Sequence, residues 1–201
     1  MAYSWESKYA EQMRDIIYYG KLLYLRGLIS AAGGNISARC GEYVLISGSN
    51  VPMGELNEEN LVLCDMQGRK LEGAEGLKPS KETPFHIRIY REHPEIKAVI
   101  HAHPNYSILW SLQGKPLPLY TESAKLKLGD VPIVPDGIPG SLELADNVLE
   151  TDRRSGGSAR AFLMEAHGIL TMGESMRECF NTAELLEDSA KIAVYQALLS
   201  K

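Results

Sequence analysis

Cysteine is scarce in this sequence and is unsuited to a disulfide framework. The 201 residues contain three cysteines, Cys40, Cys64 and Cys179, which lie far apart and form no Cys-x-x-Cys pair. An odd and dispersed set is typical of a protein from a reducing cytoplasm, which is the compartment that we expect. No apolar run approaches the ~20 residues that a helix needs to span a bilayer, and the first eight residues lack the apolar core of a signal peptide. We therefore expect no membrane association.

An excess of positive charge is also absent. The chain has 21 Lys and Arg against 26 Asp and Glu, a formal net charge of −5. This balance, without a basic tract, argues against nucleic acid or an anionic membrane as the main partner. Apolar residues make up 44% and charged residues 23%, which is ordinary for a globular protein. Because no repeat or long linker interrupts the chain, we expect residues 1–201 to form a single domain.

The apolar pattern predicts a mixture of helices and strands. Helices are expected over 6–28, from the segment around Ser80 to 92, and over 105–112, 141–152 and 175–199. Strands are expected over 43–47, 61–65, 70–72, 96–103, 131–135 and 161–166. The stretch 30–37, rich in small residues, is expected to be a loop. Since strands and helices are mixed without strict alternation, we expect an α/β or α+β sandwich, with helices on both faces of a central sheet.

Three histidines close predicted strands. His101 and His103 end an apolar run, and side chains two residues apart in a strand point to the same face. Two such imidazoles can converge on one metal ion, although a polar pair on an edge strand is the alternative interpretation. His167 closes another apolar segment, where a lone histidine would more often be a packed or capping residue. Together the three supply neutral ligands that zinc favours, with positions left open as in a catalytic site.

Glu82 stands at the start of the helix that precedes the His-x-His strand. Its carboxylate is a candidate metal ligand or general base, and the alternative is an ordinary first-turn glutamate stabilised by the helix dipole. His86 follows at i+4 on the same helix face, where we favour a supporting or packing role over ligation. His93 precedes a proline at a helix end and is interpreted as a solvated cap.

Three polar loops are suited to binding an anion. Asn35 follows two glycines whose backbone N–H groups are unobstructed, and Ser49 and Asn50 lie in a second loop of small polar residues. Ser80 and Lys81 stand at a predicted helix N-terminus, where backbone N–H groups and the helix dipole favour a phosphate. Each loop alone is weak because such residues usually form only turns. The spacing matches neither a nucleotide P-loop nor a dinucleotide fingerprint.

Five short motifs, taken in order, resemble those of the class II aldolase/adducin family. They are Gly33-Gly-Asn-Ile-Ser37, Ser47-Gly-Ser49, Pro79-Ser-Lys-Glu82, His101-Ala-His103 and His167-Gly168. The family includes fuculose-phosphate aldolase, ribulose-phosphate 4-epimerase, methylthioribulose-phosphate dehydratase and 3-oxo-tetronate 4-phosphate decarboxylase. The resemblance covers nearly the whole chain. It implies a three-layer α/β/α sandwich around a mainly antiparallel sheet, assembled as a homotetramer with active sites at subunit interfaces.

The resemblance also assigns roles to residues. It implies that His101, His103 and His167 bind one zinc ion per subunit, and imidazole and carboxylate ligands accept Mn²⁺ or Co²⁺ as well. Glu82 matches the acid/base residue, which also binds the metal when substrate is absent. Asn35, Ser49, Asn50, Ser80 and Lys81 fall where these enzymes hold phosphate.

Local departures bear on the choice within the family. The Pro79–Glu82 motif and the segment Leu128-Gly-Asp-Val-Pro-Ile-Val-Pro135 are similar to the decarboxylase branch. The epimerases carry aspartate where Glu82 stands, which disfavours epimerisation. The fuculose-type aldolases use tyrosines as proton donors, and the place of one of them falls near Tyr120-Thr-Glu-Ser123, where Glu122 is the alternative occupant.

The resulting hypothesis is a metal-dependent carbon–carbon lyase. We expect an aldolase that cleaves a small phosphorylated ketose to dihydroxyacetone phosphate and an aldehyde through a zinc-stabilised enediolate. The alternative is a 3-oxo-tetronate 4-phosphate decarboxylase that uses the same metal site. A non-catalytic, adducin-like assembly module is disfavoured because such a module needs no metal ligands.

Overall fold

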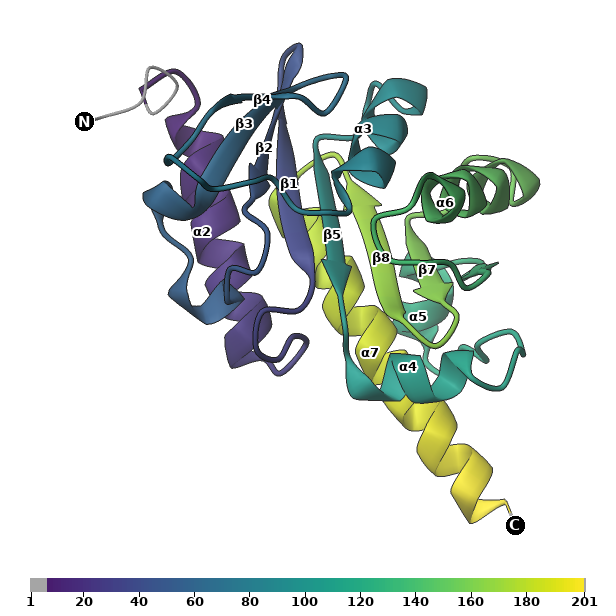
Figure 1. The fold of residues 1–201 in the computed structure, drawn as a ribbon. Coiled ribbons are helices and arrows are strands. Elements are labelled where there is room, and N and C mark those ends of the chain that lie inside the picture. Colours follow the sequence, from purple (N-terminus) through teal and green to yellow (C-terminus); the bar gives the residue numbers. More distant parts are fainter. Residues whose placement is uncertain (1–6, 201) are drawn as a thin grey trace.

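The computed structural model describes residues 7–200, which form an eight-stranded sheet flanked by helices (Figure 1). The strands are β1 (Asn35–Cys40), β2 (Tyr43–Ser47), β3 (Leu61–Asp65), β4 (Lys70–Glu72), β5 (Ala98–Ala102), β6 (Ile133–Val134), β7 (Ala161–Met164) and β8 (Gly168–Gly173). Their spatial order is β4-β3-β2-β1-β5-β8-β7-β6. Neighbouring strands are antiparallel except β6 and β7, which are parallel.

Helices cover both faces of the sheet. They are α2 (Ala10–Leu25), α3 (Thr83–Glu92), α4 (Asn105–Ser111), α5 (Glu122–Lys127), α6 (Leu142–Arg154) and α7 (Met176–Leu199), with short 3₁₀ helices at Met53–Glu55 and Glu58–Asn60. In Figure 1, α2 and α7 lie across one face, and α3 and α6 lie on the other. The predicted three-layer sandwich with a mainly antiparallel sheet is confirmed.

The alternation of side chains along the strands divides the core in two. Ile36 and Ile100 pack in a cluster with α2 and α7, whereas Val44 and Val99 pack in a second cluster with α3 and α6. Because successive residues of a strand face opposite sides, polar residues between the core positions of β1 and β5 must also be buried. This applies to Asn35, Ser37 and His101, which lie under the layer that contains α3.

Three elements differ from the sequence-based expectation. Strand β1 begins at Asn35, inside the segment expected to be a loop. Its polar residues Asn35 and Ser37 can be buried in the sheet because hydrogen bonds to Glu82 and His86 satisfy their side chains. Strand β8 was not predicted, and glycine, which is depleted in strands, stands at both of its ends. Helix α5 was also not predicted. It starts at an N-cap, Thr121, whose hydroxyl accepts a hydrogen bond from the Ala124 N–H at 3.2 Å.

The three cysteines are free and buried. Burial raises the pKa of each thiol to about 12, so all three remain protonated at neutral pH. Within residues 7–200, none of the helices has the length and apolar character that crossing a membrane requires.

Candidate metal centre

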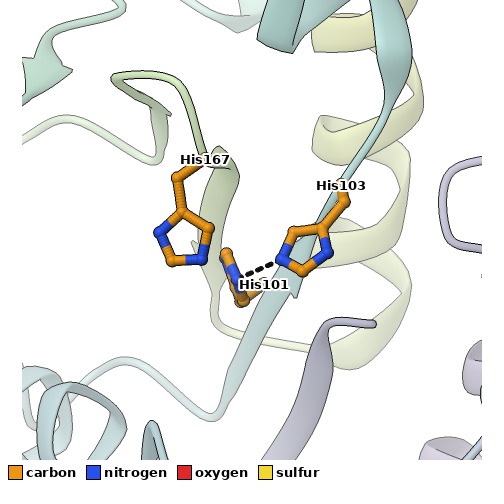
Figure 2. A group of neighbouring side chains, drawn as sticks. All are labelled: His101, His103 and His167. Atoms are coloured by element: carbon orange, nitrogen blue, oxygen red, sulfur yellow. Dashed lines mark hydrogen bonds between the residues drawn. The ribbon is translucent and has the colours of Figure 1, made fainter. Parts of the chain in front are cut away.

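Three imidazoles from separate parts of the chain meet at one end of the central strands (Figure 2). His101 lies within β5, His103 lies just after it, and His167 lies in the turn between β7 and β8. One ring nitrogen of each lies within 4.8 Å of those of the other two. The closest pair is Nε2 of His101 and Nε2 of His103, which are 2.8 Å apart. The structure therefore brings together the three histidines that the sequence singled out.

The buried ring of His101 is oriented by the neighbouring strand. Its Nδ1 lies 2.9 Å from the backbone carbonyl oxygen of Ile169 in β8. Because a carbonyl only accepts, Nδ1 holds the proton and Nε2 presents a lone pair to the cluster. Burial, followed by the proximity of the other two rings, holds the pKa of His101 well below its usual range. Burial also lowers the pKa of His103 to about 4 and that of His167 below its usual value, which keeps the rings neutral.

Glu82 lies against the same cluster. Its Oε2 is 3.2 Å from Nε2 of His101, and its Oε1 is 3.5 Å from Nε2 of His167. Asn35, directly opposite His101 in the ladder between β1 and β5, donates a hydrogen bond from Nδ2 to Oε2 at 2.7 Å. Burial raises the pKa of Glu82, and the bond from Asn35 partly opposes that shift.

These residues fit a divalent cation. Oε1 of Glu82 is buried and has no hydrogen-bond partner, and it lies 3.5 Å from Nε2 of His167. Nε2 of His101, whose proton is on Nδ1, presents a lone pair to the same region. A positive charge bound between the carboxylate and the imidazole nitrogens is stabilised by both kinds of ligand. Tetrahedral zinc with bonds of ~2.0–2.1 Å holds its ligands roughly 3.3 Å apart. Three observed separations are close to that value. Nε2 of His101 lies 2.8 Å from Nε2 of His103 and 3.2 Å from Oε2 of Glu82, and Nε2 of His167 lies 3.5 Å from Oε1 of Glu82.

Close approach of backbones holds the histidines in place. Gly34 has a φ of 71°, and a Cβ there would stand 2.5 Å from the carbonyl oxygen of His101. A Cβ on Gly168 would stand 2.2 Å from the carbonyl oxygen of Ala102 and 2.9 Å from Cδ2 of His103. Only glycine fits at these two positions, which explains why the motifs contain it.

A carboxylate also fixes the segment that follows His103. Glu187 of α7 accepts hydrogen bonds from the backbone N–H groups of Tyr106 and Ser107 at 3.0 and 2.8 Å. These donors belong to the first turn of α4, where N–H groups have no partner inside the helix. The end of β5 is therefore tied to α7.

Four of the predicted phosphate residues lie in two loops that hydrogen-bond to each other, whereas Asn35 is buried in β1 beside Glu82. Ser49 donates its N–H to the carbonyl of Lys78 at 2.9 Å, and Ser80 donates its N–H to the carbonyl of Ser47 at 3.2 Å. The side chains of Asn50 and Lys81 are exposed, whereas that of Ser80 is buried and accepts from the Glu82 N–H at 3.3 Å. Helix α3 begins only at Thr83, so Glu82, not Ser80, precedes its first turn.

The other singled-out residues lie apart from the cluster. His86 is fully buried beneath Asn35, with its Nε2 2.5 Å from Oδ1 of Asn35, which agrees with a supporting role. His93 does follow the last residue of α3, but its ring is largely buried and its Nε2 lies 2.7 Å from Oδ2 of Asp152. The expectation of a solvated cap was therefore wrong. Tyr120 is exposed, and Glu122 forms an exposed ion pair with Lys125.

Two residues that touch this region were missed in the sequence. Ser37 lies 2.7 Å from Nδ1 of His86, and Tyr90 lies 2.8 Å from Oγ of Ser37. The available signal was spacing, since Ser37 follows Asn35 at i+2 on a strand and Tyr90 follows His86 at i+4 on a helix. That signal requires knowing that 35–37 is a strand.

Comparison with known proteins now adds to this geometry. The family model of the class II aldolase and adducin N-terminal domain matches residues 14–194. The chain belongs to the class II aldolase and adducin family. Enzymes of this family that act as class II aldolases depend on a metal, and the cluster of three histidines can hold one.

Individual members of the class II aldolase family are similar over most of their length. L-fuculose phosphate aldolase of Methanococcus vannielii is 33% identical over 180 residues, which cover 90% of this chain and 94% of that protein. The 3-oxo-tetronate 4-phosphate decarboxylase of Haemophilus influenzae is 31% identical over 187 residues, which cover 90% of this chain and 86% of that protein. The crystal structure of L-fuculose-1-phosphate aldolase from Thermus thermophilus aligns with a TM-score of 0.83 at 29% identity, covering 95% of this chain and 96% of that one.

Proposed function

We propose that this chain is a metal-dependent lyase that cleaves a small phosphorylated ketose to dihydroxyacetone phosphate and an aldehyde. The observation that carries the proposal is the meeting of three neutral imidazoles with an unpartnered carboxylate oxygen of Glu82. The L-fuculose phosphate aldolases among the relatives support aldol cleavage as the reaction.

In this proposal His101, His103, His167 and Glu82 hold the cation, which is zinc, with Mn²⁺ or Co²⁺ as alternatives. A divalent cation bound there supplies Lewis acidity toward the carbonyl and neighbouring hydroxyl of the substrate. Glu82 takes the proton of the substrate hydroxyl and delivers a proton to the carbon released when the bond breaks.

The substrate phosphate is proposed to bind at Asn35, Ser49, Asn50, Ser80 and Lys81. The two loops that carry the last four are joined by backbone hydrogen bonds, and the exposed Lys81 adds a positive charge beside Glu82. Anchoring the phosphate at a fixed distance from the cation orients the bond that breaks.

A second candidate is decarboxylation of a 3-oxo-tetronate 4-phosphate. Lys81 favours it, because an ammonium next to Glu82 is placed to bind a substrate carboxylate as well as a phosphate. The decarboxylase of Haemophilus influenzae supports this reading. Both reactions give the same three-carbon product, and they differ in whether an aldehyde or carbon dioxide leaves.

A substrate panel tests the proposal. The zinc-loaded protein is incubated with ketose 1-phosphates and 3-oxo-tetronate 4-phosphates, and dihydroxyacetone phosphate and carbon dioxide are measured. Aldolase activity gives dihydroxyacetone phosphate without carbon dioxide, and decarboxylation gives both. A protein that holds no metal and releases neither product would contradict the proposal and favour an adducin-like assembly module. His103→Ala is the matched inactive control.

Assembly as a homotetramer with active sites at subunit interfaces is part of the proposal. Large apolar side chains are exposed on α4 (Leu109), directly after it (Leu112) and on α5 (Leu126), which supports contacts between subunits. Sedimentation equilibrium tests it, and a monomer that is active at all protein concentrations would contradict it.

A further inference from the structure

A chain of buried hydrogen bonds leads from Glu82 into the layer under α3. Glu82 contacts Asn35, which in turn contacts His86. His86 contacts Ser37, and Ser37 contacts Tyr90. We call Asn35, His86, Ser37 and Tyr90 the buried relay. The heavy-atom distances along it are 2.7, 2.5, 2.7 and 2.8 Å. The exposed fraction is 3% for Asn35, 1% for Tyr90 and 0% for Ser37 and His86. With so little exposure, each member depends on the others for its hydrogen bonds.

The fold places these residues in register. Asn35 and Ser37 are two residues apart on β1, so their side chains point to the same face of the sheet. His86 and Tyr90 are four residues apart on α3, so they lie one turn apart on one face of that helix. The pair on β1 therefore faces the pair on α3, and their side chains hydrogen-bond to one another.

The direction of the relay follows from the chemistry of its groups. The Asn35 NH₂ donates to Glu82, which leaves the Oδ1 of Asn35 facing His86 as an acceptor. Nε2 of His86 must then donate, and because burial lowers the pKa of His86 to about 3, the neutral ring has only an acceptor at Nδ1. Ser37 therefore donates to Nδ1. Because the Ser37 hydroxyl proton is committed to Nδ1, the Tyr90 hydroxyl must donate across its 2.8 Å contact with Oγ of Ser37, and it shares that proton with the carbonyl oxygen of Ser37 at 3.0 Å.

We propose that Ser37 and His86 are positioning residues that hold the Asn35 amide with its NH₂ group toward Glu82. The opposite orientation of the amide would set Oδ1 against the carboxylate of Glu82, with no donor between two acceptors. Held as observed, Glu82 keeps one oxygen on Asn35 and directs the other to the imidazole cluster. The catalytic consequence of this inference rests on the proposed function, whereas the hydrogen-bond direction does not.

The first test is independent of activity. ¹⁵N NMR of the histidine rings in the zinc-loaded protein reports which nitrogen of each ring carries a proton. The relay predicts that His86 is neutral, with Nε2 protonated and Nδ1 unprotonated. A His86 ring that is charged, or that carries its proton on Nδ1, would overturn the proposal.

The second test separates positioning from a general loss of structure. In Ser37→Ala, kcat is expected to fall about tenfold with KM and zinc content unchanged, and the His86 signals should lose their single protonation pattern. Ser37→Thr, which keeps the hydroxyl, should restore most of the rate. The matched control is Ser189→Ala, which removes another buried hydroxyl that bonds only to the helix backbone at Leu185.

The outcomes are distinguishable. A folded, zinc-loaded Ser37→Ala variant with wild-type kcat would overturn the positioning role. If the variant did not fold, the ring nitrogens of the wild-type protein would still decide the direction of the relay. If the wild-type protein cleaved none of the substrates, the proposed function would fail while the NMR result continued to test the relay.

Discussion

Replacing Gly168 by alanine tests whether close backbone packing holds the candidate metal centre together. Gly168 opens β8, directly after His167, and its φ lies outside the left-handed region, so the added methyl group causes no torsional strain there. The strain is steric, because the new Cβ would stand 2.2 Å from the carbonyl oxygen of Ala102, about 1.2 Å short of the 3.4 Å at which ordinary contacts begin.

The carbonyl of Ala102 has little freedom to move away. Ala102 ends β5 and is paired with Ile169 of β8, so displacing it disturbs the two strands that carry His101 and flank His167. Overpacking of this kind costs up to about 3 kcal/mol, which lowers the Tm of a chain of this length by roughly 6–12 °C. The same shift moves His103, whose Cδ2 would be 2.9 Å from the new Cβ, and zinc affinity should fall at least about tenfold.

Gly41→Ala is the matched control. Gly41 has a φ of 65° and open space around the position of a Cβ, so its substitution costs only backbone strain, about 1 kcal/mol, far from the histidines. Calorimetry and zinc titration of both variants measure the effects. If Gly168→Ala melted and bound zinc like the wild type, the backbone approach would not be what positions the histidines, and this reasoning would be refuted.

Three further predictions concern charge and metal. Glu82→Gln should keep the far-UV circular dichroism spectrum and lower kcat about 10²–10⁴-fold, and a full rate would contradict its acid/base role. Dialysis against a chelator should abolish product release and lower the Tm, and added zinc should restore both, whereas metal-independent turnover would contradict the proposed lyase. In metal-free protein, the His86 pKa of about 3 lies below the ordinary 6.5, so the unfolded chain binds more protons between those values. His86 alone should therefore lower the free energy of unfolding by about 1.4 kcal/mol per pH unit as pH falls from 6.5 toward 3, and the three cluster histidines, whose pKa values are also lowered, add to that slope. Urea unfolding at several pH values should show that slope reduced in His86→Gln, and an unchanged slope would show that His86 titrates normally.

The sequence predicted the layered architecture better than the central strands. Amphipathic helices such as α6 show the periodicity that marks one buried side, and strand β7 is a short continuous apolar run. Strand β1 escaped prediction because its polar residues are small and follow two glycines, although they alternate with Ile36, Ala38 and Cys40. Strand β8 has glycine, which is depleted in strands, at both of its ends. In β1, burial of Asn35 and Ser37 depends on partners 47 to 53 residues away, which no local pattern reveals.

The cluster of three histidines was more predictable than its surroundings for a related reason. His101 and His103 share a local spacing, and imidazoles at strand ends carry their own chemical meaning, so the short motifs suffice. The roles of Ser37, His86 and Tyr90 arise only from the packing of α3 on β1, and serine or tyrosine in isolation indicates nothing specific. The contact between His93 and the buried Asp152 could not be predicted either, because the two residues lie 59 positions apart in the sequence.

The order of the strands places the candidate metal ligands and the predicted phosphate loops in different parts of the candidate site. Strands β1, β5 and β8 are neighbours in the centre of the sheet, and they position Asn35, His101 and the turn that carries His167. The loops that contain Ser49 and Lys81 follow β2 and precede α3, and backbone hydrogen bonds join them outside that central group. A cation held by paired central strands is kept in fixed geometry, whereas residues on the loops can differ without disturbing the ladder. Under the proposed function, this division lets one metal site serve either aldol cleavage or decarboxylation, and it assigns the choice of substrate to the loops.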